Sequence, residues 1–303
     1  AVYVVGDFLR ETRLRKGYTQ EEVSYGICTT ASLSRIENGA QKPGRLILEK
    51  LFERLGTENN LFNSFVSREE MELYSAIQEL VRNITDDDVV KIEKQIDVVE
   101  KLAVNTTELE HQCLYFAKGE LARQKEKDDK KAMEMYMKAI HITLPDFDGK
   151  NPLRNNLLTF DEIMIINAIA ILHAKADDIM TAVQLGMWLK KYMEEKIVDG
   201  TMKIAKYPMI LYNLSNWLGR ENCHKEALKM ADLGIRFCIR YGNLAFFPIL
   251  VFNKGGALAE LGKIDQAKKY LHQSVTIFEA MDRPDLIQVA TDWCKLHYRI
   301  DIQ

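Results

Sequence analysis

A short stretch near the start of the chain carries small or hydrogen-bonding side chains with no acid among them: Thr30, Ala31, Ser34 and Arg35. We predict a helix here, because Thr29 is a good N-cap residue and Gly39 a good terminator. In that helix Leu33 and Ile36 turn inward, which leaves the four residues on the outward face. This face can donate hydrogen bonds to a partner without presenting a negative charge to it.

Three segments further along the chain carry a side-chain amide at a similar position: Asn167, Asn213 and Asn253. An amide offers a donor and an acceptor together, which suits both edges of a peptide bond. A row of amides can therefore hold an extended peptide backbone without reading its side chains. Asn216 lies three residues after one of them, and we expect Tyr212 and Phe252 to form apolar pockets beside the row.

Four short helices are predicted within the first sixty residues. The first ends at Gly17, and the second begins at a capping box in which Thr19 and Glu22 satisfy backbone N–H groups. A tight turn leads to the helix after Thr29, and a fourth helix follows over 45–56. Helices this close in sequence cross steeply, so the third is free to project one face outward.

The segment TQEEVSYGICTTASLSRIENG, residues 19–39, resembles the helix-turn-helix of the phage-repressor (Xre-like) family, and the resemblance covers residues 5–56. It implies binding to double-stranded DNA, with the third helix in the major groove and four residues at the reading positions: Thr30, Ala31, Ser34 and Arg35. Arg35 is the strongest candidate for a base contact, because a guanidinium can bind O6 and N7 of guanine together. The same resemblance places three residues at phosphates of the DNA backbone: Gln20, Lys42 and Arg45. It also implies a structural pair between Arg13 and Glu37.

The rest of the chain contains a repeated pattern of helix hairpins. Three copies each reach an alanine after a polar turn, and these alanines are separated by 45 and 40 residues: Ala182, Ala227 and Ala267. A looser copy reaches Ala132, 50 residues before the first of them. Self-similarity at this period, with small residues at helix crossings, is typical of stacked helix hairpins. The last copy resembles a tetratricopeptide repeat, with four residues at the packing positions: Gly255, Leu258, Ala267 and Leu271.

We therefore predict an all-α protein in which an N-terminal helix-turn-helix domain is followed by a tetratricopeptide-like α-solenoid. The expected domains are the helix-turn-helix domain at 1–66, a stiff connector helix at 67–82, and a repeat domain at 83–303 for sensing and dimerisation. In such a solenoid the first helix of each hairpin lines the concave side, so the three asparagines are expected to face one groove.

An Xre-like head on a degenerate tetratricopeptide body resembles the Rgg/PlcR/PrgX group of peptide-pheromone receptors from Gram-positive bacteria, over nearly the whole chain. LYNLSNWL and MIINAIAIL resemble the segments whose asparagines hold the pheromone backbone, which implies this role for Asn213 and Asn167. Lys118 occupies the analogous position of the first hairpin. The resemblance implies a homodimer on a palindromic operator and an imported short peptide that alters DNA binding, as in quorum sensing.

Two other functions stay open. One is a tetratricopeptide adaptor whose groove binds a protein partner, and the other is a phage-type regulator of the same architecture with a different ligand. Selection of a palindrome from random DNA distinguishes a regulator from the adaptor. Calorimetry with short synthetic peptides distinguishes the pheromone receptor from the phage-type regulator.

Composition argues against several other classes. The net charge of −3 disfavours a wholesale polyanion binder, although residues 1–67 hold nine Lys and Arg against eight Asp and Glu. No run approaches the roughly 18 consecutive apolar residues of a membrane span, and we recognise no secretion signal. The five cysteines are scattered and odd in number, as in a reducing compartment, so we expect the protein in the cytoplasm and not at a membrane.

We expect no enzymatic activity, no cofactor and no metal site. The segment GGALAELGK superficially resembles a phosphate loop, but Gly256 and Gly262 are one residue too far apart for that motif. Histidines and cysteines come at most in isolated pairs, such as His111 with Cys113, without the further ligands that a zinc ion requires.

Overall fold

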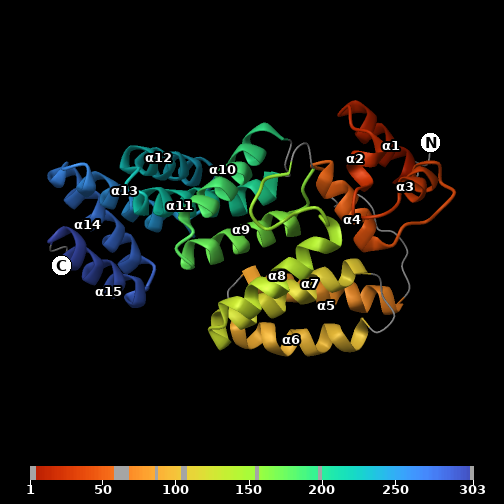
Figure 1. Cartoon of the computed structure of the whole chain (residues 1–303), viewed down its shortest axis with the longest axis horizontal. Helices are drawn as coiled ribbons and strands as arrows, with labels where there is room; N and C mark the ends of the chain where they lie inside the picture. The colour runs from red at the N-terminus through yellow and green to blue at the C-terminus, as the bar shows by residue number, and fades with distance from the viewer. Residues whose placement is uncertain are drawn as a thin grey trace. The chain divides into compact units, whose positions relative to one another are not determined.

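The computed structural model describes residues 5–57, 68–85, 88–103, 108–153, 157–196 and 200–300. Every regular element in these ranges is helical, which confirms the predicted all-α class (Figure 1). The chain forms two compact units. The first comprises Ala1–Leu172 with Lys196–Asp199, and the second comprises His173–Glu195 with Gly200–Gln303.

The first unit begins with four short helices: α1 (Val5–Arg15), α2 (Gln20–Ser24), α3 (Thr30–Glu37) and α4 (Arg45–Arg54). The predicted capping box of α2 is confirmed. Oγ1 of Thr19 accepts a hydrogen bond from the backbone N of Glu22 at 3.1 Å, and the Glu22 carboxylate accepts one from the backbone N of Thr19 at 2.7 Å. Thr29 caps α3 in the same way, by accepting from the backbone N of Ser32 at 3.0 Å. Side-chain caps therefore fix the first turns of both α2 and α3.

An apolar core holds these four helices together, and its buried members include Leu9, Val23, Leu33, Leu48, Leu51, Phe52 and Leu55. Burying each large aliphatic side chain contributes about 1.5–3 kcal/mol. Gly6 lets α1 approach α3, because a Cβ atom at this position would overlap the backbone carbonyl oxygen of Ile36. We call the four helices, residues 5–57, the head.

The first unit continues with α5 (Arg68–Thr85), α6 (Val89–Leu102), α7 (Glu108–Leu121), α8 (Asp129–Thr143) and most of α9 (Phe160–Lys175). A single turn of π-helix, Ala122–Glu126, extends α7. Helix α5 covers the residues predicted as a connector and runs further, to Thr85. Its buried residues Leu73, Ile77 and Leu80 form one face, and α5 packs on α6 and α7. This helix is therefore part of the helical stack and not an isolated rod.

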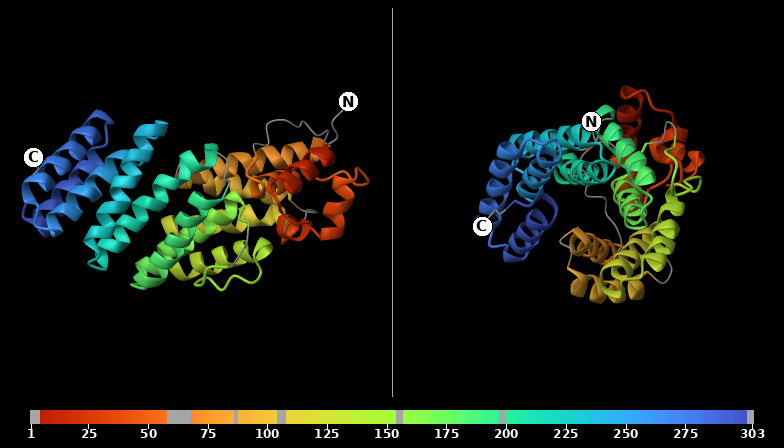
Figure 2. Two further views of the ribbon diagram at one scale, coloured as in Figure 1. Left: turned by 90° about the horizontal axis from the view of Figure 1, so that it is seen from above. Right: turned by 60° about the vertical axis from the view of Figure 1, so that its left-hand side comes forward.

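The second unit contains α10 (Ile179–Glu195), α11 (Gly200–Arg220), α12 (His224–Tyr241), α13 (Phe247–Glu260), α14 (Ile264–Ala280) and α15 (Pro284–Trp293). The π-helical turn η2 (Cys294–Tyr298) extends α15. Figure 2 shows these helices stacked in chain order, from green to blue. Neighbours pack closely, and Gly255 of α13 leaves room for the side chain of Leu271 on α14, as the predicted packing positions require.

The hairpin turns repeat a backbone detail that confirms the predicted register. One residue in each turn adopts a left-handed conformation with φ between 57° and 74°: Lys127, Asp177, Asn222 and Gly262. Five residues after each stands one of the predicted alanines, and all four alanines are at most 2% exposed: Ala132, Ala182, Ala227 and Ala267. The turn and the small buried residue therefore form one repeated unit, as expected of stacked hairpins.

Candidate functional site

Helix α3 has the two faces that the sequence predicts. Leu33 and Ile36 are buried in the head, whereas Thr30, Ala31 and Arg35 are exposed. Ser34 is half-buried at the edge of the outward face. The structure therefore brings the four predicted reading residues together on one side of a helix.

Arg35 is held in place by two side chains of the head. Its Nε donates to Oε1 of Gln41 at 3.0 Å, and its Nη2 donates to Oγ of Ser32 at 3.2 Å. The guanidinium therefore lies along the exposed edge of α3 with part of its rotamer freedom already lost. A group held in this way loses less entropy when it binds a partner.

Glu37 is a buried hub beneath α3. Its carboxylate accepts from Nε and Nη2 of Arg13 at 2.6 and 2.8 Å, which confirms the predicted pair. The hydrogen bonds to Glu37 raise the pKa of Arg13 above its usual value. The same carboxylate accepts from Nε2 of Gln20 at 2.7 Å. Sequence reasoning missed this third contact, which anchors Gln20 at the start of α2.

The two basic residues after α3 have different surroundings. Lys42 is exposed in the loop between α3 and α4. Arg45 begins α4, and its guanidinium carbon lies 4.2 Å from the ring centroid of Tyr74 on α5, a cation–π contact. The hydroxyl of Tyr74 donates to Glu49 at 2.6 Å, which fixes the ring that carries Arg45.

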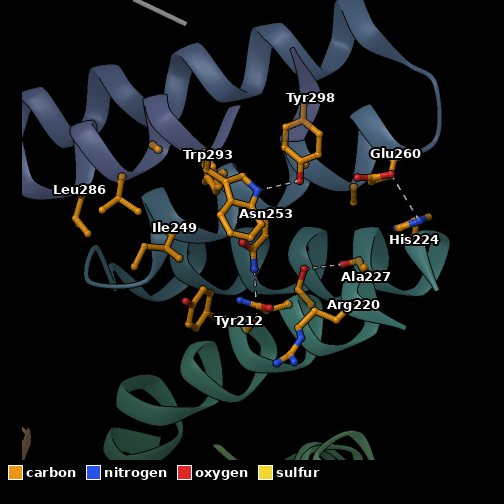
Figure 3. Close-up of a pocket in the computed structure, with 18 of the residues that line it drawn as sticks. Tyr212, Arg220, His224, Ala227, Ile249, Asn253, Glu260, Leu286, Trp293 and Tyr298 are labelled. Atoms are coloured by element: carbon orange, nitrogen blue, oxygen red, sulfur yellow. Dashed lines mark hydrogen bonds and ion pairs between the residues drawn. The ribbon is translucent and has the colours of Figure 1, made fainter. Parts of the chain in front are cut away.

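A cavity of about 440 Å³ opens within the second unit (Figure 3). Its walls come from α11, α12, α13, α14 and the C-terminal α15–η2 segment, and its apolar members include Ile249, Phe252, Phe278, Leu286, Val289 and Trp293. Tyr212, Asn216 and Asn253, three of the predicted ligand residues, also line it. The volume lies in the range of small-ligand sites in proteins. We call this cavity the pocket.

Polar groups of the pocket already bond to one another. Nδ2 of Asn253 donates to the backbone O of Tyr212 at 3.3 Å, which links α13 to α11. Burial raises the pKa of the Tyr212 hydroxyl, and its hydrogen bond with Asn216 opposes the rise. On the opposite wall, Nε1 of Trp293 lies 3.5 Å from the hydroxyl of Tyr298. His224 and Glu260 face each other with Nε2 and Oε2 4.0 Å apart, and both line the pocket.

The expected row of three asparagines stays a prediction, and only one of its members lines the pocket. Asn167 and Asn213 are only 4% and 8% exposed, and neither lines the pocket. Residues 163, 165, 166, 168, 169 and 170 around Asn167 are all buried, and Met164 and Ile171, three and four residues away, are half-buried. On α11 the pocket is lined by Tyr212, Ser215, Asn216, Gly219 and Arg220, and Asn213 lies at the edge of this arc. Asn253 alone of the three faces the pocket.

The expected peptide contact of Lys118 stays a prediction. Lys118 lies on α7 in the first unit, where its Nζ is 2.6 Å from Oε1 of Glu100. It therefore pairs within the α6–α7 layer and is not among the residues that line the pocket.

Sequence reasoning missed the residues that the C-terminal segment contributes to the pocket, above all Trp293 and Tyr298. The sequence predicts no ligand contact for this segment. The available signal is Trp293 itself, a large aromatic residue that remains 46% exposed. Large exposed apolar side chains near a cavity are a recognised mark of binding surfaces.

Within the described ranges, no helix has both the length and the apolar character needed to cross a bilayer. The same ranges hold no group of three or more His, Cys, Asp or Glu side chains placed to bind a metal ion.

The capped helix pair and the outward face of α3 define a helix-turn-helix protein. Residues 4–65 match the family described as helix-turn-helix domain. The chain is also 38% identical over 63 residues to YqaF, an uncharacterized helix-turn-helix transcriptional regulator of Bacillus subtilis, and this match covers 20% of the chain and 83% of YqaF. The chain therefore belongs to the helix-turn-helix transcriptional regulators.

Solved structures extend the likeness to the repeat domain. The crystal structure of Bacillus thuringiensis PlcR in complex with the peptide PapR7 and DNA is similar with a TM-score of 0.60 and 18% identity, over 95% of this chain and 98% of that chain. Apo PlcR is similar with a TM-score of 0.58 and 16% identity, over the same shares of the two chains. The head and the helical repeats together therefore have the fold of PlcR.

Proposed function

We propose that this transcriptional regulator binds a short peptide in the pocket and that the peptide modulates its binding to operator DNA. The observation that carries the proposal is the lining of the pocket, where amides of Asn216 and Asn253 stand among aromatic and aliphatic walls. Amides suit a peptide backbone and apolar walls suit its side chains. PlcR, which shares the fold, has been crystallised with a peptide and DNA.

On the DNA side, α3 enters the major groove and its exposed residues read the bases, with Arg35 as the principal base contact. Lys42 and Arg45 bind backbone phosphates beside the groove. Gln20, anchored on Glu37, uses its second amide hydrogen for a phosphate near the start of α2. A homodimer formed through the repeat domain places two heads on the half-sites of a palindrome.

The peptide acts by changing the balance between two states of the dimer. Occupied and empty pockets favour different curvatures of the hairpin stack, which changes the spacing of the heads. Half-sites about 34–36 Å apart, or multiples of that distance, then fit better or worse. An imported peptide in this role makes the protein a cytoplasmic quorum-sensing regulator.

Selection from random DNA duplexes, with and without a library of short synthetic peptides, tests the proposal. We expect an enriched palindrome and a change in its affinity when a peptide binds. Calorimetry then identifies the peptide, and Trp293 provides a fluorescence signal because it lines the pocket. Selection of a palindrome without any response to peptides contradicts the sensing role, and binding of a protein partner without DNA selection indicates an adaptor.

A further inference from the structure

The turn between α2 and α3 rests on the helical stack of the first unit. Gly26, with φ +69°, packs so closely on the end of α8 that a Cβ atom there would overlap the carbonyl oxygen of Thr143. The hydroxyl of the preceding residue, Tyr25, donates to the carboxylate of Asp146, in the loop that follows α8. The turn that orients α3 is therefore fitted to another part of the chain, although Gly26 itself remains exposed on its other side.

Arg54, at the end of α4, holds the same turn from within. Its Nη1 donates to the backbone O of Tyr25, and its Nη2 lies 2.8 Å from Oε1 of Glu162 on α9. The side chains of Arg54 and Glu162 are both fully buried. A buried guanidinium that loses its carboxylate is left uncompensated, so this pair resists separation.

Glu162 is itself fixed at the start of α9. Its Oε2 accepts from the backbone N of Thr159 at 2.5 Å, while its own backbone N donates to Oγ1 of Thr159 at 3.3 Å. This arrangement is a capping box, which fixes both the helix end and the direction of the carboxylate. A chain of hydrogen bonds thus runs from the first turn of α9, through Arg54, to the carbonyl group that precedes α3.

Two further contacts join α4 to the first turn of α9. Nζ of Lys50 lies 2.9 Å from Oδ2 of Asp161, and the backbone N of Phe160 donates to Oε2 of Glu53 at 2.9 Å. All the side chains in these contacts are at most 15% exposed. The head is therefore joined to α9 by buried polar contacts with defined geometry, which set orientation more strictly than an apolar surface does.

We propose that Glu162 is a positioning residue for DNA recognition, which acts through Arg54 to fix the turn that orients α3. Bidentate binding of a base edge tolerates little displacement of the guanidinium, whereas single-point phosphate contacts tolerate more. Loss of the Glu162 contact therefore reduces discrimination between sequences more than it reduces binding to DNA in general. On this proposal residues 159–162, more than a hundred positions after α3, contribute to DNA recognition although they lie outside the head.

The variant Glu162→Gln tests the proposal in the full-length protein, with Glu120→Gln as a matched control. Glu120 is also a buried carboxylate of the first unit, at 5% exposed, but its partners Tyr136 and Arg123 lie away from the head. Affinities for the selected operator and for random DNA are measured below the unfolding temperature of each variant. We expect the ratio of operator affinity to random-DNA affinity to be about tenfold lower in Glu162→Gln than in the wild type. A loss of this size is equivalent to one base contact. We expect the ratio for Glu120→Gln to equal that of the wild type.

A double variant, Arg54→Met with Glu162→Leu, keeps the test decisive if Glu162→Gln folds poorly. Replacing a buried ion pair with apolar residues of similar size often restores stability, but it cannot restore the hydrogen bond to Tyr25. We expect a folded protein with reduced discrimination. Wild-type discrimination in a folded Glu162→Gln or double variant overturns the positioning role and leaves the proposed function intact. Failure of the wild type to select any sequence overturns both, since the proposal rests on DNA recognition by α3.

Discussion

Nε of Arg35 lies 3.0 Å from Oε1 of Gln41, so a side chain in the loop after α3 holds the guanidinium of the proposed reading residue. The contact links the two parts of the head that we propose to meet DNA in different ways. In the proposed function Arg35 contacts base edges, and Lys42, the next residue after Gln41, contacts phosphates. The two kinds of contact can therefore be separated by substitution.

Arg35→Ala and Lys42→Ala are expected to have different effects on DNA binding. Arg35→Ala removes a base contact, so it should cost about 1–3 kcal/mol on the operator and much less on random DNA. Lys42→Ala should weaken binding to all sequences and reduce the slope of log affinity against log salt by about 1. Fluorescence anisotropy at several salt concentrations measures both quantities. An unchanged selected motif in Arg35→Ala contradicts the assignment of the reading residue.

Asn253→Ala and Asn213→Ala should affect different properties. Asn253 lines the pocket, so its loss should weaken peptide binding, with about 1 kcal/mol of stability lost with the hydrogen bond to Tyr212. Asn213 is buried outside the pocket, so its loss should lower the free energy of unfolding by about 1–3 kcal/mol and leave the peptide affinity of the folded protein unchanged. Calorimetry and urea denaturation separate the two effects. If Asn213→Ala weakened peptide binding, Asn213 would belong to the peptide site together with Asn253.

Gly256→Val should narrow the pocket. A Cβ atom at Gly256 would lie 2.7 Å from the hydroxyl of Tyr298, which can move because it is the end of a side chain. We expect peptide affinity to fall by about tenfold or more, equivalent to roughly 1.4 kcal/mol, with thermal stability retained. The control is Gly200→Val at the exposed start of α11, which does not line the pocket and where an added Cβ meets no atom within 4 Å. Equal peptide affinity in Gly256→Val and the wild type would place the ligand elsewhere.

The buried carboxyl of Glu53 should make the protein less stable as the pH rises. Burial raises the pKa of Glu53 to about 7 from its usual 4.5, and Asp161 and Glu49 reinforce the shift while Lys50 opposes it. Between these values the folded protein keeps a proton that the unfolded chain releases. The free energy of unfolding therefore decreases from pH 4.5 to about 7, by at most about 1.4 kcal/mol per pH unit.

Urea denaturation of the wild type and of Glu53→Gln at a series of pH values checks this dependence. The variant carries no titrating group at position 53, so its stability should vary less over the same window. If the free energy of unfolding changed with pH in the same way in the wild type and in Glu53→Gln, Glu53 would be ionised in the folded protein throughout this window.

The left-handed turn residues allow a matched pair of stability tests. Lys127 adopts φ 57° and Gly262 adopts φ 74° at equivalent turns. A left-handed conformation costs about 1–2 kcal/mol for a residue with a Cβ atom, offset in part by the greater freedom of glycine when unfolded. Lys127→Gly should therefore stabilise the protein by about 0.5–1 kcal/mol, and Gly262→Ala should destabilise it by about 1 kcal/mol. Thermal unfolding measures both, and a loss of stability in Lys127→Gly would contradict the argument.

The sequence was sufficient to predict the head because its signals are local. Thr19 and Thr29 cap helices a few residues away, and the outward face of α3 follows from the positions of Leu33 and Ile36. The hairpin register was predictable for the same reason, since the alanine follows each turn at a fixed distance.

The pocket and the contacts of the head were less predictable because they depend on packing between distant segments. The position of Asn213 in the repeat predicts which helix carries it, but it does not predict which face of that helix packs against its neighbours. The Arg54–Glu162 pair joins residues 108 positions apart, and neither residue has a neighbour in sequence that suggests its partner. Trp293 reaches the pocket only because the last helix folds against the stack.

The fit of Gly26 against the backbone of α8 has a consequence for engineering. A chimera that carried the head of another regulator on residues 68–303 would place a foreign turn against Thr143 and remove the cation that neutralises Glu162. Operator preference in this chain is better redirected by resurfacing α3 alone at residues 30, 31 and 35, where new side chains meet solvent, with the half-buried residue 34 kept.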